Sequence, residues 1–290
     1  MRKITTRKIT NIIKIIFFVV FILIYMSPLI VTFTNSFMTK REINENYALV
    51  KTIFESDTGY VDLNLIPNPV SLEEYKIIFF DTPVYLNSFW NSVKITLPII
   101  IGHVIISAFG AYGFTVLDFK LKRLLLFLYI VVMLLPLQVT LLPNYMVAEF
   151  LNIKESYLAI ILPAIFNPLG VFLLYQHMKL IPKSYLEAAE IDGAGHLDIF
   201  FKIVLPSVTG GIASLATLTF IEYWNLIDQG IIFITDRSKQ PLSLFLAGMN
   251  ESQLGISFAA SSFYVIPVLI VLFYCHDYLK NGIEISGLKG

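Results

Sequence analysis

Residues 177–208 contain the side chains whose types and spacing are most informative about chemistry. Ser184 and Glu187 have the three-residue spacing of a capping box, which predicts the start of a helix. Ala188 and Ala189 give that helix a face with almost no side-chain bulk. Such a face suits close docking into a groove on a partner protein, but an ordinary amphipathic connector has the same pattern. The residues alone leave both interpretations open.

Two glycines and a proline divide this stretch further. Gly193 and Gly195 predict the end of the first helix, since glycine accepts the left-handed backbone that a helix C-terminus requires. Asp198 is of a type that starts a helix, so a second short helix is expected to begin there and to lead to Pro206. The prediction is two short helices with a break between them.

A second group of polar side chains lies within the apolar stretch 209–233. Glu222 and Asn225 are three residues apart, so they share one helix face, and Trp224 is offset from it. Polar side chains within such an apolar stretch are costly, so this segment is a candidate lining of a solute pathway. The alternative is that these groups satisfy one another, or a neighbouring helix, at an interface. The candidate ligand contacts in this chain are Gln138, Asn167, Thr217, Glu222, Trp224 and Asn225.

Composition places these groups in a membrane protein. The 290 residues are 56% hydrophobic and 14% charged, whereas soluble domains carry about 25% charged residues. The 21 lysines and arginines balance 21 aspartates and glutamates, so no basic surface favours nucleic acid. One cysteine and four histidines, with no two histidines at ligand spacing, predict neither a disulfide framework nor a metal site.

Six apolar runs reach the roughly 20 residues that span a bilayer, and backbone groups in lipid must be paired within the segment, so each predicts a helix. The prolines at 136, 143, 163 and 168 are expected to kink the third and fourth. The first run is too long for a cleaved signal and is interpreted as an anchor. The runs are Ile12–Phe33, Phe89–Phe114, Leu124–Val147, Tyr157–Tyr175, Thr209–Phe233 and Ser257–Tyr278.

The distribution of lysine and arginine predicts the orientation, because cytoplasmic loops carry the excess. An all-α, six-span membrane protein with both termini in the cytoplasm fits best. The predicted divisions are a cytoplasmic N-terminus at 1–11, the first span at 12–33 and an extracytoplasmic segment at 34–88. The remaining core, 89–290, holds five spans and the cytoplasmic loop 182–206.

The loop residues also resemble a known signature, the EAA motif of binding-protein-dependent ABC importer permeases. The position of the loop before the fifth span agrees with that family, although Gly210 stands where its members often have a second proline. Segments around residues 135–143, 170–172 and 224–225 are similar to the maltose-type second permease of the sugar-importer branch. The residues that carry the motif are Glu187, Ala188, Ala189, Asp192, Gly193, Ala194, Phe200 and Pro206.

The resemblance implies a multi-pass subunit of a bacterial inner (plasma) membrane importer for a sugar or oligosaccharide. It implies a second permease subunit in a heterodimer, two ATPase subunits that bind ATP and Mg²⁺, and an extracytoplasmic solute-binding protein. The motif residues would couple the permease to the ATPase, with Glu187 meeting a basic residue, Gly193 supplying the bend, and Asp192 and Phe200 bracing the loop.

No phosphate-binding loop of the type Gly-x-x-x-x-Gly-Lys-Ser/Thr occurs in the sequence. The chain is therefore expected to be non-catalytic, with no cofactor of its own. Two alternatives stay open at this point: an importer permease for a polyol, sugar phosphate or peptide-like solute, and an ion-coupled secondary transporter.

Overall fold

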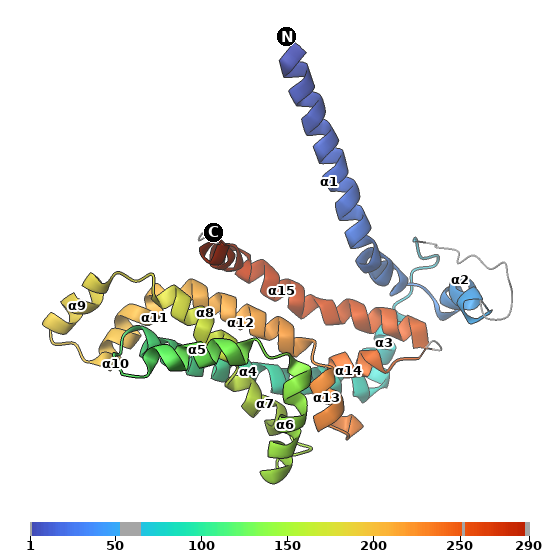
Figure 1. Ribbon diagram of the computed structural model, residues 1–290. Helices are drawn as coiled ribbons and strands as arrows, with labels where there is room; N and C mark the ends of the chain where they lie inside the picture. The colour runs from blue at the N-terminus through green and yellow to red at the C-terminus, as the bar shows by residue number, and fades with distance from the viewer. Residues whose placement is uncertain (1, 53–64, 251–252, 288–290) are drawn as a thin grey trace. The chain divides into compact units, whose positions relative to one another are not determined.

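The computed structural model describes residues 2–52, 65–250 and 253–287, and all the regular structure in these ranges is helical (Figure 1). Four helical stretches are long and apolar enough to cross a membrane. They are α1 (Arg2–Asn35), α4 (Pro83–Thr115), the 21-residue stretch Leu158–Met178 made of α7 (Leu158–Ile165) and α8 (Pro168–Met178), and α15 (Leu254–Gly287). The all-helical prediction is confirmed, with four membrane-length helices in the described ranges, or up to six if bent pairs count as single spans.

The predicted third span is a pair of helices rather than one. Helices α5 (Lys122–Met133) and α6 (Leu137–Phe150) meet at 102°. Pro136 lies at the break with φ −66° and ψ 147°, an extended conformation, and it has no N–H to donate to a helical bond. Pro136 therefore interrupts the helix as predicted, but it ends α5 at a sharp corner instead of kinking one continuous helix.

The predicted fifth span ends earlier than expected. Helix α12 (Thr209–Trp224) stops at Asn225, whose side-chain amide donates to the carbonyl of Ile221 at 2.8 Å. A separate helix, α13 (Asp228–Phe233), covers the rest of the apolar run. On its other side α12 is preceded, at a bend of 74°, by α10 (His196–Ile199), η2 (Phe200–Val204) and α11 (Leu205–Ser207).

The chain divides into two compact units. The first comprises residues 1–85 and 248–266. It contains α1, α2 (Lys40–Thr52), α3 (Glu73–Lys76), η1 (Ile77–Asp81) and the beginning of α15. Aromatic rings pack its interior: Phe79 meets Phe263 edge-on at 4.8 Å, and the hydroxyl of Tyr85 donates to the carbonyl of Ala260. The side chains of α1 from residue 11 to residue 30 are exposed and almost all apolar, as expected of a helix in contact with lipid.

The second unit comprises residues 86–247 and 267–290. Its remaining elements are α9 (Lys183–Ile191), the 3₁₀ turn η3 (Arg237–Lys239) and α14 (Leu242–Ala247). Two apolar clusters lie along α4: one around Ile95 and Ile99 with residues of α6, α7 and α13, the other around Ala108 and Tyr112 with residues of α8 to α11. Helix α8 packs against both α5 and α12.

A buried histidine joins three parts of this second unit. His103 of α4 is only 2% exposed, and its Nε2 lies 3.0 Å from the carbonyl oxygen of Asn167, between α7 and α8. Because a carbonyl can only accept, Nε2 carries the hydrogen, and Nδ1 accepts from the hydroxyl of Thr219 on α12 at 3.0 Å. One neutral imidazole therefore connects α4, α12 and the α7–α8 break.

Close approach beside this histidine requires glycine at position 170. A Cβ added there would collide with Ser107 Oγ and His103 Nε2, both on α4. Ser107 Oγ is buried and has no hydrogen-bond partner among the described residues, so the space between α4 and α8 is filled by polar atoms. The α4–α8 contact is thus set by backbone packing against polar side chains.

We predict that Gly170→Ala lowers stability by about 1–3 kcal/mol, the usual range for forced overpacking. The matched control is Gly113→Ala, since a Cβ at Gly113 on α4 meets nothing within 4 Å. That control should be neutral or stabilising by up to about 1 kcal/mol. The unfolding midpoint of the purified protein in detergent measures both, and equal midpoints for the two variants would contradict the packing argument.

Candidate functional site

The first short helix of the predicted loop, α9, begins differently from expectation. Pro182 is its N-cap, with φ −60° and ψ 130°, and no side chain caps the helix. Ser184 lies one residue inside the helix, so the predicted capping box with Glu187 is wrong. Pro182 cannot donate a backbone hydrogen bond, so it separates α9 from the preceding turn. This proline was a stronger signal for the start of α9 than the spacing of Ser184 and Glu187.

The end of α9 follows the prediction at Gly193. This residue has φ +81°, the N–H of Gly193 donates to the carbonyl of Glu190 at 3.0 Å, and the N–H of Ala194 donates to the carbonyl of Ala189 at 2.9 Å. These two bonds together form a Schellman motif, which satisfies the last carbonyls of the helix. A glycine is required at this position because other residues rarely adopt that backbone.

Gly195 and Asp198 do not lie at the helix ends where they were predicted. Gly195 is the N-cap of α10, with φ −75° and open space where a Cβ would be, so it does not end α9. Asp198 lies inside α10 and pairs with Lys202 four residues later at 2.5 Å, on an exposed face. The glycine break therefore has one obligatory glycine, Gly193.

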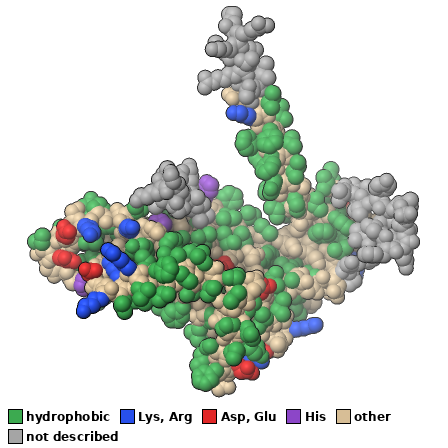
Figure 2. All heavy atoms as spheres, in the orientation of Figure 1, with side chains coloured by type: hydrophobic (Ala, Val, Ile, Leu, Met, Phe, Trp, Pro, Cys, Tyr) green, Lys and Arg blue, Asp and Glu red, His purple; other side chains and the backbone are tan. Residues whose placement is uncertain are grey.

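The motif residues divide between an exposed face and a buried one. Glu187, Ala188 and Asp192 are exposed, and Figure 2 shows charged side chains gathered where α9 and α10 lie. Ala189 is 9% exposed and Phe200 2%, and both belong to the apolar cluster of this unit. Ala189 therefore packs within the chain itself. Of the two other motif residues, Ala194 is half-buried against the same cluster, and Pro206 is exposed near the start of α11.

Phe200 and His196 attach this loop to α4. The ring of Phe200 stacks on Phe109 at 4.6 Å and meets Tyr112 edge-on at 5.2 Å. The hydroxyl of Tyr112 donates to the carbonyl of His196 at 3.2 Å. The loop is thereby held against the helix bundle while α9 presents its other face.

Sequence reasoning missed three apolar side chains on the exposed part of the loop. Ile191 is 86% exposed, Leu197 68% and Tyr185 62%. The sequence did hold a signal for them, since all three lie in a loop rich in charged residues. A group of large apolar side chains on such a surface can mark a protein contact. Ile191 and Leu197 flank the glycine break on its two sides.

The candidate ligand contacts do not gather at one surface. Thr217 and Trp224 are buried: the threonine hydroxyl donates to Ala213 O at 2.8 Å, and the indole packs on Phe220 and Phe89. Glu222 on α12 and Asn225, the residue that ends this helix, are both exposed.

Two further candidates lie at helix starts. Gln138 is exposed in the first turn of α6. Asn167 is the N-cap of α8, and its Oδ1 accepts from the N–H of Leu169 at 3.0 Å. Asn167 therefore has a structural role as the cap of α8. An asparagine directly before a proline is typical of such a helix start.

Curated relatives cover most of the chain. The "Arabinooligosaccharides transport system permease protein AraQ" of Halalkalibacterium halodurans is 29% identical over 77% of this chain and 81% of the relative. The "Polygalacturonan/rhamnogalacturonan transport system permease protein YtcP" of Bacillus subtilis is 29% identical over 94% of this chain and 96% of the relative.

A solved structure shares the fold. One chain of a bacterial ABC transporter involved in the import of the acidic polysaccharide alginate has a TM-score of 0.79 and is 20% identical. The match covers 94% of this chain and 97% of that chain. At this identity the likeness establishes the fold.

The family model described as "Binding-protein-dependent transport system inner membrane component" matches residues 103–285, more than half of the chain. The resemblance seen in the loop residues is confirmed, and with it the interpretation as a multi-pass membrane transport subunit instead of an enzyme. The chain belongs to the family of binding-protein-dependent transport system inner membrane components.

Proposed function

We propose that this chain is the permease subunit of an ATP-driven importer for a sugar or oligosaccharide, and that residues 182–206 couple it to the ATPase. The observation that carries the proposal is the division of this loop into a buried, anchored side and an exposed side. The relatives named for transport of arabinooligosaccharides and of polygalacturonan/rhamnogalacturonan support the solute class.

The exposed side of the loop fits a protein partner. Ile191 and Leu197 are large, exposed apolar side chains in the same loop as the exposed carboxylate of Glu187. Covering such surface is favourable by about 25 cal/mol per Å², and the charged group adds specificity. Because Ser184 is not an N-cap, the alternative of a capping role for Glu187 loses its support.

The membrane topology that we propose has six spans with both termini in the cytoplasm. It counts the bent pair α5–α6 as one span and α12 as another, beside the four long helical stretches, and it leaves α10, η2 and most of α11 in the cytoplasmic loop. Non-helical backbone at membrane depth is tolerated where protein or a water-filled cavity covers it, so the α5–α6 corner would face the pathway or the second permease.

The proposed assembly contains a second permease subunit, two ATPase subunits and a solute-binding protein outside the membrane. ATP and Mg²⁺ would bind to the ATPase subunits. Within this chain Glu222 and Asn225 are the proposed solute contacts, since a carboxylate within a span is costly against lipid. Trp224, which is packed between Phe89 and Phe220, would position this face without touching solute.

The test of the function is uptake of labelled sugars by cells that express the intact transporter. The panel holds neutral and acidic oligosaccharides, a polyol, a sugar phosphate and a peptide. ATP-dependent uptake of one sugar, lost in Glu187→Ala with normal assembly, is the expected result. Uptake of only a non-sugar compound, or uptake that continues without an ATPase partner, would contradict the proposal.

We predict that Gly193→Ala reduces this uptake several-fold while Gly195→Ala does not. Forcing alanine into the left-handed region costs about 1–2 kcal/mol and loosens the end of α9. Gly195 has an ordinary φ and open space, so alanine fits there. Initial uptake rates and co-purification of the ATPase measure the effect. Equal rates in the two variants would show that the Schellman geometry is not needed for coupling.

We predict that Glu222→Leu lowers the initial uptake rate about 10-fold, because a hydrogen bond to a charged group contributes roughly 1.5–3 kcal/mol. Glu149→Leu, at an exposed glutamate in the last turn of α6, is the control and should transport normally. If Glu222 faced lipid, leucine would be tolerated or would stabilise the protein, and unchanged uptake would reveal this.

A further inference from the structure

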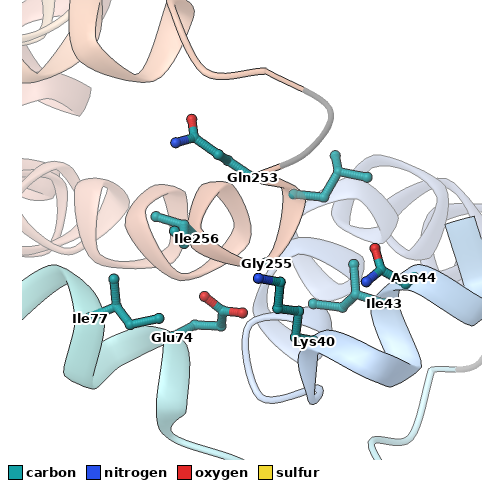
Figure 3. A pocket seen from close by; sticks show the side chains of 9 residues that line it. Lys40, Ile43, Asn44, Glu74, Ile77, Gln253, Gly255 and Ile256 are labelled. Carbon is teal, nitrogen blue, oxygen red and sulfur yellow. The ribbon is translucent and has the colours of Figure 1, made fainter.

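A small pocket lies within the first unit, among α2, α3, η1 and the first turn of α15. Its volume is about 60 Å³. Figure 3 shows the side chains that line it. They combine two charged groups, two amides and a set of aliphatic groups: Lys40, Ile43, Asn44, Glu74, Ile77, Gln253, Leu254, Gly255 and Ile256.

Glu74 is the unusual member of this pocket. It is 4% exposed, and its Oε2 is buried without a hydrogen-bond partner. Its Oε1 lies only 2.6 Å from where a Cβ on Gly255 would be, so the carboxylate is pressed against the first turn of α15. A buried carboxylate oxygen with no partner is costly, since such groups in native proteins nearly always have one. None of the described residues donates to this oxygen, so it offers the pocket an acceptor for a hydroxyl of a bound molecule.

Lys40 supplies the complementary group. In Figure 3 the Lys40 and Glu74 side chains extend toward the same space from different helices. The three ion pairs found among the described residues do not include one between them. Burial raises the pKa of Glu74 above its usual range, Glu73 adds to this, and Lys40 opposes it. An ammonium donor and a carboxylate acceptor thus face one cavity without closing on each other.

This arrangement selects against ions. A cation would meet Lys40 and the N-terminal end of α15, and an anion would meet Glu74. A hydroxyl group both donates and accepts, so a neighbouring pair of hydroxyls could donate to Glu74 and accept from Lys40. Ile43, Ile77 and Ile256 offer aliphatic surface to the carbon atoms between the hydroxyls. One water needs about 10–15 Å³ on such a measure, so the pocket has room for a few heavy atoms only.

We propose that this pocket binds a neutral vicinal diol, either a glycerol-sized polyol or the edge of one sugar residue. In the proposed topology it lies on the extracytoplasmic side of the membrane. The pocket needs only the residues of the first unit, so the inference goes beyond the proposed transport function and does not depend on it.

The test is saturation-transfer NMR on the full-length protein in lipid nanodiscs, titrated with glycerol and then with neutral mono- and oligosaccharides. Wild type should show saturable binding of at least one of these compounds. Glu74→Gln and Lys40→Met should each weaken it about 10-fold or more, as expected for the loss of a charged hydrogen-bond partner. Glu45→Gln is the matched control, because Glu45 is exposed, does not line the pocket and is not among the groups that shift the pKa of Glu74. Melting curves of all variants separate lost binding from lost folding.

No binding by wild type would mean that the cavity holds solvent only and would overturn the inference, as would binding that Glu74→Gln and Lys40→Met leave unchanged. Uptake assays on the same variants keep the two proposals apart. ATP-driven sugar uptake without binding at this pocket overturns only the diol site. Diol binding without ATP-driven sugar uptake supports the site and contradicts the transport function.

Discussion

The second unit depends on how the backbone carbonyl of Asn167 is hydrogen bonded where α7 gives way to α8. The N–H of Gly170 reaches this oxygen only at 3.4 Å, and His103 donates to it at 3.0 Å. A carbonyl left unpaired at membrane depth costs several kcal/mol, so the imidazole makes the helix break tolerable. The same ring accepts a hydrogen bond from Thr219. The imidazole that pairs the Asn167 carbonyl therefore also holds α4 and α12 at a fixed spacing.

Three of the helix ends also have a local hydrogen bond, and its type differs among them. At Asn167 a side chain caps the next helix, and at Asn225 a side-chain amide returns to Ile221. At Gly193 the backbone closes its own bonds through a left-handed residue. Position 193 alone among these three sites relies on backbone conformation, and it lies in the loop, where water can satisfy the groups that remain.

Sequence patterns predicted the helical class, the apolar runs and the glycine turn, because each depends on local composition. They could not predict that Pro136 turns the third run by 102° or that the fifth ends at Asn225, since tertiary packing decides whether a break bends slightly or becomes a corner. In the sequence, Ala188 and Ala189 are two equivalent small residues of the predicted docking face. Only the packed structure shows that Ala188 is exposed and Ala189 buried.

That difference bears on the coupling role that we propose for residues 182–206. One side of the loop is fixed: Ala189 packs into the apolar cluster, Phe200 stacks on Phe109, and Tyr112 bonds the carbonyl of His196. A rigid attachment of this kind transmits force applied at the exposed residues directly to α4, because close-packed interiors are hardly compressible. Helix α4 also carries His103, whose two hydrogen bonds reach α12 and the α7–α8 break. In the proposed mechanism, a displacement of the loop by the ATPase would reach α12, which bears Glu222, through these packed and hydrogen-bonded groups.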